Sequence, residues 1–190
     1  MDSIHNKSSI KSLEIVKIKN GDVEFYEHLF KRYYQPLIRF TYRYVKDEHI
    51  AENIIQDVFL YLWNERGRLD FTINIKTYLY NAVKNRSLNY LRRKGVENKY
   101  KSFEVVLDKD DQNPEVIMIN NDLRNVISDC INKLPKNRRE IFCMNRFDHL
   151  TYTEIASILN ISIKTVETQM SRSLKFLRKK LSLFFTAIVL

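Results

Sequence analysis

Residues 151–170, TYTEIASILNISIKTVETQM, contain the most specific structural motif in the C-terminal half of the chain. Thr151 followed three residues later by Glu154 is a capping box, which marks the start of a helix. That helix is short, because Asn160 tolerates the left-handed backbone of a tight turn. Ser162 then caps a second helix. The stretch therefore predicts a helix-turn-helix, a motif whose second helix enters the major groove of DNA.

The second of these helices has two faces of different character. Its apolar stripe repeats in steps of three and four residues, as a helix packed on one side requires: Ile163, Val166, Met170, Leu174, Leu177 and Leu181. The opposite face is polar and basic. Its early residues are the candidates for contacts with base edges: Lys164, Thr165, Thr168, Gln169 and Arg172. Lys175 and Lys179 follow one and two turns later and are candidates for phosphate contacts.

Apolar residues at helical spacing predict three helices in the N-terminal half, over residues 25–44, 48–66 and 75–93. Asp22 and Asp47 are suitable caps for the first two. The second helix carries a polar strip: Glu52, Asn53, Gln56 and Asp57. From these residues alone, the strip is interpreted as an ordinary solvated face. A further helix is expected to open at Leu134-Pro135, since proline is tolerated at the first helical position.

The third of these helices combines basic side chains with asparagine and tyrosine. Lysine and arginine contact phosphates, asparagine reads base edges, and an exposed tyrosine stacks on unpaired bases. The candidates for binding single-stranded nucleic acid are Tyr80, Asn81, Lys84, Asn85, Arg86, Asn89, Arg92 and Arg93. A second interpretation stays open for the tyrosines, because Tyr78 and Tyr80 are explained equally well as core aromatic residues.

The composition favours an all-α fold, and the net positive charge favours binding to polyanions. The chain of 190 residues has a formal net charge of +9, with three glycines and three prolines, too few for many tight turns. The charge divides into +6 over residues 1–94, −3 over 95–121 and +6 over 122–190. Basic blocks favour nucleic acid, although charge alone fits a solvated surface equally well. The acidic segment 95–121 is predicted to be a flexible linker between two helical domains.

Several classes of protein find no support in the sequence. It has no glycine-rich nucleotide loop, no catalytic triad motif and no ligand set at zinc spacing, so an enzyme, a metal site and a cofactor are not expected. Two cysteines are too few for a disulfide framework, and no signal-peptide pattern opens the chain, which favours the cytoplasm. The apolar stretch 181–190 is too short to cross a bilayer.

In this order, the motifs resemble those of the sigma-70 family of bacterial RNA polymerase initiation factors, in its short extracytoplasmic-function (ECF) group. The resemblance lies in AENIIQDVF over residues 51–59, YLYNAVKN over 78–85, LPKNRREIF over 134–142 and the helix-turn-helix. It implies a sigma domain 2-like helical bundle over 1–94, the linker, a sigma domain 4-like helix-turn-helix over 122–182, and an apolar tail over 183–190. That tail is similar to the tails of factors from Bacteroidota.

The resemblance also implies partners and roles. Glu52, Asn53, Gln56 and Asp57 would bind core RNA polymerase. Residues 75–93, with the loop 68–74, would melt and read the −10 element of promoter DNA, with Asn85 holding a flipped base, and the helix-turn-helix would read the −35 element. An anti-sigma factor, often membrane-bound in this family, is an implied partner, and no small-molecule substrate is implied. A stand-alone LuxR-type regulator is the alternative, because its helix-turn-helix is similar.

Overall fold

The computed structural model describes residues 13–68, 74–95 and 114–189, with the backbone alone for residues 114–122 and 183–189. Every regular element in these ranges is a helix, which confirms the predicted all-α class for the described part of the chain. The chain divides into two compact units, Met1–Tyr100 (unit 1) and Lys101–Leu190 (unit 2). None of the described helices is long and apolar enough to cross a membrane.

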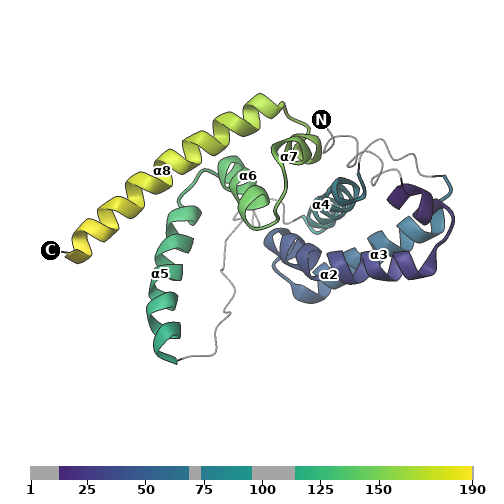
Figure 1. Ribbon diagram of the computed structural model, residues 1–190, viewed down its shortest axis with the longest axis horizontal. Helices are drawn as coiled ribbons and strands as arrows, with labels where there is room; N and C mark the ends of the chain where they lie inside the picture. The colour runs from purple at the N-terminus through teal and green to yellow at the C-terminus, as the bar shows by residue number, and fades with distance from the viewer. Residues whose placement is uncertain (1–12, 69–73, 96–113, 190) are drawn as a thin grey trace. The chain divides into compact units, whose positions relative to one another are not determined.

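Unit 1 contains three long helices, each in contact with the other two (Figure 1). They are α2 (Val23–Val45), α3 (Glu48–Glu65) and α4 (Ile75–Arg93), and residues 13–19 are also helical. Asp22, Asp47 and Asn74 each accept a hydrogen bond from a backbone N–H in the first turn of the helix that follows. The two aspartate caps and the three helices were predicted, with bounds within two residues of those observed.

Apolar side chains from all three helices fill the space between them. Leu37 of α2, Ile55 and Leu62 of α3 and Leu79 of α4 have no exposed surface. Each fully buried side chain of this kind contributes about 1.5–3 kcal/mol by leaving water. Because this core fixes the inner faces of α3 and α4, their outer faces present polar side chains in set positions.

Unit 2 is organised around its last helix, α8 (Ile163–Val189). That helix contacts α5 (Pro114–Asn132), α6 (Lys136–Arg146) and α7 (Tyr152–Leu159) (Figure 1). The core between these elements includes side chains that are at most 2% exposed: Leu134, Met144, Ile155 and Val166. The core holds α8 by one face and leaves the other face open.

The predicted helix-turn-helix is formed by α7 and α8. The N–H of Glu154 donates to Thr151 Oγ1 at 3.2 Å, and the N–H of Thr151 donates to the Glu154 carboxylate at 2.8 Å, which completes the capping box. Asn160 ends α7 in the left-handed conformation, with φ 53°. The N–H of Thr165 donates to Ser162 Oγ at 3.0 Å, so the second helix is capped as expected.

Two predicted boundaries in unit 2 were wrong. α5 begins at Pro114, inside the segment 95–121 that was predicted to be a linker. Proline is tolerated there because the N–H that it lacks would have no partner within the first turn. Pro135 is the N-cap of α6 and not its first residue. Residues 96–113 of the predicted linker lie outside the described residues.

The first turn of α8 also differs from the prediction. Ile163 is 45% exposed, whereas Val166, Met170 and Leu177 are buried. As the first residue of the helix, Ile163 lies at the end of the packed face, where the core no longer covers it. The stripe instead includes Ser173, which is fully buried and donates its hydroxyl hydrogen to the Gln169 carbonyl oxygen at 2.8 Å. The backbone of the predicted tail, residues 183–189, continues α8.

Candidate functional site

The outer face of α3 carries the polar strip, and two apolar residues accompany it. Asn53, Gln56 and Asp57 are exposed and Glu52 is half-buried. Leu60 is 60% exposed and Tyr61 is 47% exposed. The spacing of positions 53, 56, 57 and 60 places these side chains on one face, called here the α3 surface. Sequence reasoning missed Leu60, although its helical angle groups it with Gln56 and not with the buried Ile55.

Arg86 connects the α3 surface with α4. Its Nη1 lies 3.5 Å from Asp57 Oδ2, and its guanidinium carbon lies 5.7 Å from the centre of the Tyr61 ring. Tyr78 also lies near this cluster. Burial raises the pKa of the Tyr78 hydroxyl, the neighbouring Tyr61 adds to the increase, and the Arg86 cation opposes it. Arg86 was predicted as a nucleic-acid residue, and in this structure its guanidinium faces α3.

Four other candidates from α4 share its outer face, because positions 81, 85, 89 and 92 are three or four residues apart. Asn85 Nδ2 donates to Asn81 Oδ1 at 3.1 Å, and Arg92 Nη1 donates to Asn89 Oδ1 at 3.2 Å. These side chains support one another along the helix and form a row of amide and guanidinium groups. Lys84 and Arg93 complete the set, half-buried and exposed respectively.

The structure corrects the interpretation of Tyr80 as an exposed stacking residue. Tyr80 is 1% exposed, and its ring packs edge-on against Phe40 with 4.9 Å between ring centres. A ring buried in this way cannot stack on a base, so the alternative of a core aromatic residue is the right one. Its position in the helix explains this, because it shares a face with the buried Val83 and Ser87. Of the expected pocket loop, residues 68–74, only its two ends, Arg68 and Asn74, lie within the described residues.

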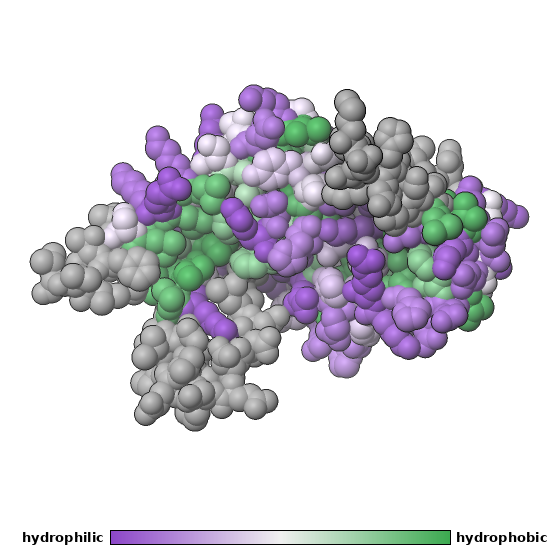
Figure 2. Space-filling model, in the orientation of Figure 1, coloured by the Kyte–Doolittle hydropathy of each residue, from purple (hydrophilic) through white to green (hydrophobic). Residues whose placement is uncertain are grey.

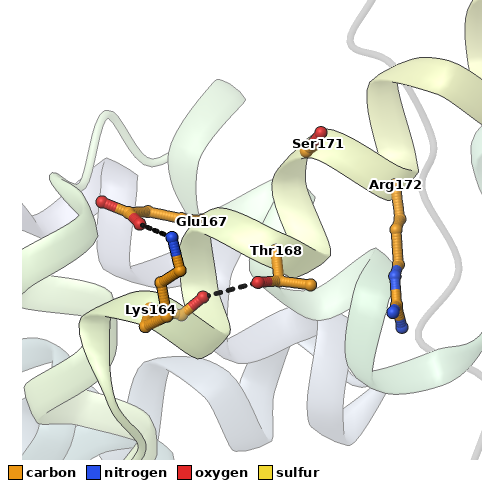
Figure 3. Close-up of a pocket in the computed structure, with 5 residues that line it drawn as sticks. All are labelled: Lys164, Glu167, Thr168, Ser171 and Arg172. Atoms are coloured by element: carbon orange, nitrogen blue, oxygen red, sulfur yellow. Dashed lines mark hydrogen bonds and ion pairs between the residues drawn. The ribbon is translucent and has the colours of Figure 1, made fainter.

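The outer face of α8 forms a shallow hollow in unit 2 (Figure 3). It is lined by Lys164, Glu167, Thr168, Ser171 and Arg172. Lys164 Nζ lies 3.6 Å from Glu167 Oε2, and the Thr168 hydroxyl donates to the Lys164 carbonyl oxygen at 2.8 Å. Arg172 forms no ion pair among the described residues and extends from the helix (Figure 3). Glu167 and Ser171 belong to this face and were not among the predicted site residues.

The remaining candidates on α8 take different positions. Lys175 and Lys179 are exposed and continue the polar face, whose hydrophilic side chains line the outer edge of the helix in Figure 2. Thr165 is exposed, and its Oγ1 lies 2.9 Å from Ser162 Oγ. Gln169 is half-buried toward α6, where its Oε1 accepts a hydrogen bond from Arg138 Nε at 3.3 Å. No group of three or more His, Cys, Asp or Glu side chains that could hold a metal ion occurs in the described ranges.

Comparison with known proteins accounts for both units. The family model for sigma-70 region 2 matches residues 29–96, and the model for sigma-70 region 4 matches residues 124–177. Together the two matches cover nearly two-thirds of the chain. The first match includes α3 and α4, and the second includes the helix-turn-helix.

Proteins with similar sequences are named ECF RNA polymerase sigma factors. The ECF RNA polymerase sigma factor SigW of Bacillus subtilis is 28% identical over 178 residues, which cover 88% of this chain and 94% of SigW. The ECF RNA polymerase sigma-E factor of Escherichia coli K12 is 23% identical over 84% of this chain and 87% of its own.

Two solved structures share the fold. CnrH, in complex with the cytosolic domain of CnrY, has a TM-score of 0.60 at 17% identity, over 93% of this chain and 97% of CnrH. RpoE of Bartonella quintana, in complex with the anti-sigma factor NepR, has a TM-score of 0.53 at 18% identity, over 82% of this chain and 98% of RpoE. With both sigma-70 regions present in order and ECF factors similar over most of its length, the chain belongs to the ECF group of the sigma-70 family of RNA polymerase sigma factors.

Proposed function

We propose that this chain binds core RNA polymerase through the α3 surface and directs it to promoters, with α4 at the −10 element and α8 at the −35 element. One observation carries the proposal: each of the two matched sigma-70 regions contains a helix with an outer face of polar and basic side chains. A LuxR-type regulator is not favoured, because that reading leaves the match to sigma-70 region 2 without an explanation.

The α3 surface is suited to a protein partner. It combines amide and carboxylate groups with the exposed Leu60, and interfaces commonly consist of an apolar contact surrounded by polar groups. We assign Asn53, Gln56 and Asp57 to direct contacts with the polymerase. Glu52 has a supporting role, because its carboxylate is engaged by Tyr34 and lies 3.7 Å from His49 Nδ1.

The outer face of α4 is suited to the single strand that forms when the promoter opens. Unstacking a base costs a few kcal/mol, so the strand must gain contacts in return. Asn85 offers an amide for the edge of an extruded base, and Asn81 holds that amide from the preceding turn. Arg92 and Arg93 supply positive charge for the adjacent phosphates.

The outer face of α8 is suited to the major groove of duplex DNA. Lys164, Thr168 and Arg172 line the outer face of α8, and in helix-turn-helix proteins the second helix of the motif enters the major groove. Arg172 is the strongest candidate for a specific contact, because arginine pairs with guanine through two hydrogen bonds. The pairing of Glu167 with Lys164 lowers the negative charge that this face would present to phosphates.

An anti-sigma factor is the proposed regulatory partner. RpoE was solved in complex with the anti-sigma factor NepR, and we extend that type of partner to this chain. Transcription takes place in the bacterial cytoplasm, so the proposed function places the chain there. An anti-sigma factor at the inner membrane would hold it in an inactive state.

The proposal and the LuxR-type alternative differ in what the free chain does. We expect the chain to bind purified core RNA polymerase, measured by fluorescence anisotropy, and to bind promoter DNA tightly only when core is present. Tight, sequence-specific binding to duplex DNA by the free chain, together with no measurable core binding, would favour the alternative.

A further inference from the structure

A side chain outside the helix-turn-helix makes a hydrogen bond with one inside it. Arg138 lies in the first turn of α6, and its Nε donates to Oε1 of Gln169 on α8 at 3.3 Å. Both side chains are half-buried, and this is the hydrogen bond that Arg138 makes among the described residues. The contact joins residues 31 positions apart in the sequence. Gln169 is therefore held from a second helix, unlike Arg172 on the open face.

The chemistry of arginine fixes which end of the glutamine amide faces it. A guanidinium has five N–H donors and no acceptor, so the amide atom beside Arg138 must be the oxygen. The amide nitrogen, which carries two N–H donors, then remains available to other acceptors. The carbonyl oxygen of Gln169 keeps a second lone pair, but the hydrogen bond with Arg138 fixes the position of that oxygen.

This orientation matters for base recognition. A freely rotating glutamine recognises adenine with both ends of its amide, accepting from N6 and donating to N7. A glutamine that presents only donors matches guanine better, since guanine offers acceptors at both N7 and O6. The same residue can therefore prefer either purine, depending on what holds its oxygen.

We propose that Arg138 is a positioning residue for promoter recognition: it holds the Gln169 oxygen against α6 so that the amide donors face the −35 element and favour guanine over adenine at one base pair. The inference rests on the proposed −35 role of α8. Arg138 itself need not touch DNA. The difference in binding free energy between guanine and adenine equals that of about one hydrogen bond, which corresponds to roughly a threefold to tenfold preference for guanine.

The experiment measures transcription by the holoenzyme from a promoter set in which each −35 base pair is changed to each of the other three. The factors compared are the wild type, Arg138→Ala, Gln169→Ala and the double variant. Lys136→Ala is the matched control, because it removes an exposed cation from the same turn of α6. Arg138→Met serves as a second variant that keeps the aliphatic stem of the side chain packed. Thermal unfolding of each factor checks that its fold is intact.

The expected result is a change at a single base pair. The wild type should prefer guanine over adenine there by about threefold to tenfold, and Gln169→Ala should remove that preference. Arg138→Ala and Arg138→Met should shift the preference toward adenine at the same base pair. Once Gln169 is replaced by alanine, replacing Arg138 should not change the guanine-to-adenine ratio further. The effects of substitutions at two residues in contact are not additive. Lys136→Ala should leave the guanine-to-adenine ratio unchanged.

Three results would overturn the inference. Arg138 variants could leave the guanine-to-adenine ratio unchanged at the base pair that Gln169→Ala alters, or lower transcription from all promoters alike, as loss of a phosphate contact does. Gln169→Ala could also alter no base pair. In each case the −35 role of α8 stands if the wild type still discriminates among −35 sequences. A wild type that shows no −35 preference at all would reject the proposed −35 role and the inference together.

Discussion

Arg86 of α4 directs its guanidinium at the carboxylate of Asp57 on α3, with 3.5 Å between Nη1 and Oδ2. The pair joins two surfaces that we assign to different partners, the polymerase and the −10 strand. Both side chains are partly exposed, at 38% for Arg86 and 65% for Asp57. An exposed pair of this kind contributes at most about 1 kcal/mol to stability. Its importance therefore lies in the placement of the two side chains.

The first prediction concerns polymerase docking. Replacing Gln56 and Asp57 together by alanine should weaken core binding by roughly tenfold, because two polar contacts are lost at the centre of the α3 surface. The unfolding free energy should change by less than about 1 kcal/mol. Fluorescence anisotropy with labelled core measures the affinity. Glu27→Ala is the control, because Glu27 is an exposed carboxylate on α2 that is also ion-paired, with Lys31 at 2.7 Å.

Unchanged core affinity in the double variant would contradict the assignment of the α3 surface. Arg86→Ala separates the two ways in which Asp57 could act. If Asp57 contacts the polymerase directly, Arg86→Ala keeps most of the core affinity. If the pair acts as a unit, Arg86→Ala and Asp57→Ala should weaken binding equally.

The second prediction concerns the −35 element. Arg172→Ala should lower transcription from promoters with an intact −35 element by roughly tenfold, because a bidentate arginine–base contact contributes about 1–3 kcal/mol. The comparison is with the same promoters carrying a scrambled −35 element, on which the variant and the wild type should be equally weak. An equal fractional loss on both sets would show that Arg172 contacts phosphates and does not read bases.

The third prediction separates the core role of Tyr80 from base stacking. Tyr80→Ala should lower the unfolding free energy of unit 1 by about 3–5 kcal/mol, as loss of a buried aromatic ring does. Tyr80→Phe keeps the ring that packs against Phe40 and should keep most of that stability. Chemical denaturation measures both variants. A Tyr80→Ala chain as stable as the wild type, but defective in opening promoters, would restore the stacking role.

The fourth prediction concerns pH. Burial raises the pKa of Tyr26 from 10.0 to about 12, and its hydroxyl donates to the Phe59 carbonyl oxygen. In the unfolded chain the same hydroxyl ionises near its ordinary value of about 10. The neutral Tyr26 hydroxyl therefore makes its full contribution to the unfolding free energy below about pH 10, and this contribution is lost as the pH rises through about 12. The unfolding midpoint should fall with pH in this window, and Tyr26→Phe should make the fall shallower. An identical slope in both chains would contradict this.

Much of the fold could be predicted because its signals are local. Asp22, Asp47 and Thr151 cap helices through residues three positions away, and Asn160 allows a turn through its own backbone. Apolar spacing likewise gave the helices of unit 1. Pro114 was misread because proline marks both loops and helix starts, and only the packing of the following residues separates the two.

The candidate sites could be predicted only in part, since their details depend on contacts between helices. The sequence leaves two explanations for Tyr80, and its burial against Phe40 of α2 decides between them. The contacts of Arg86 with Asp57 and of Arg138 with Gln169 join residues 29 and 31 positions apart. No spacing rule within one helix reveals such pairs.

We propose that this chain selects promoters for core RNA polymerase. The most direct test transcribes genomic DNA of the source bacterium with its purified core, with and without the chain, and maps the 5′ ends of the transcripts. We predict new start sites that share a −10 and a −35 element and that disappear when either element is scrambled. Start sites identical to those of core alone, although the chain is folded, would show that this chain does not select promoters.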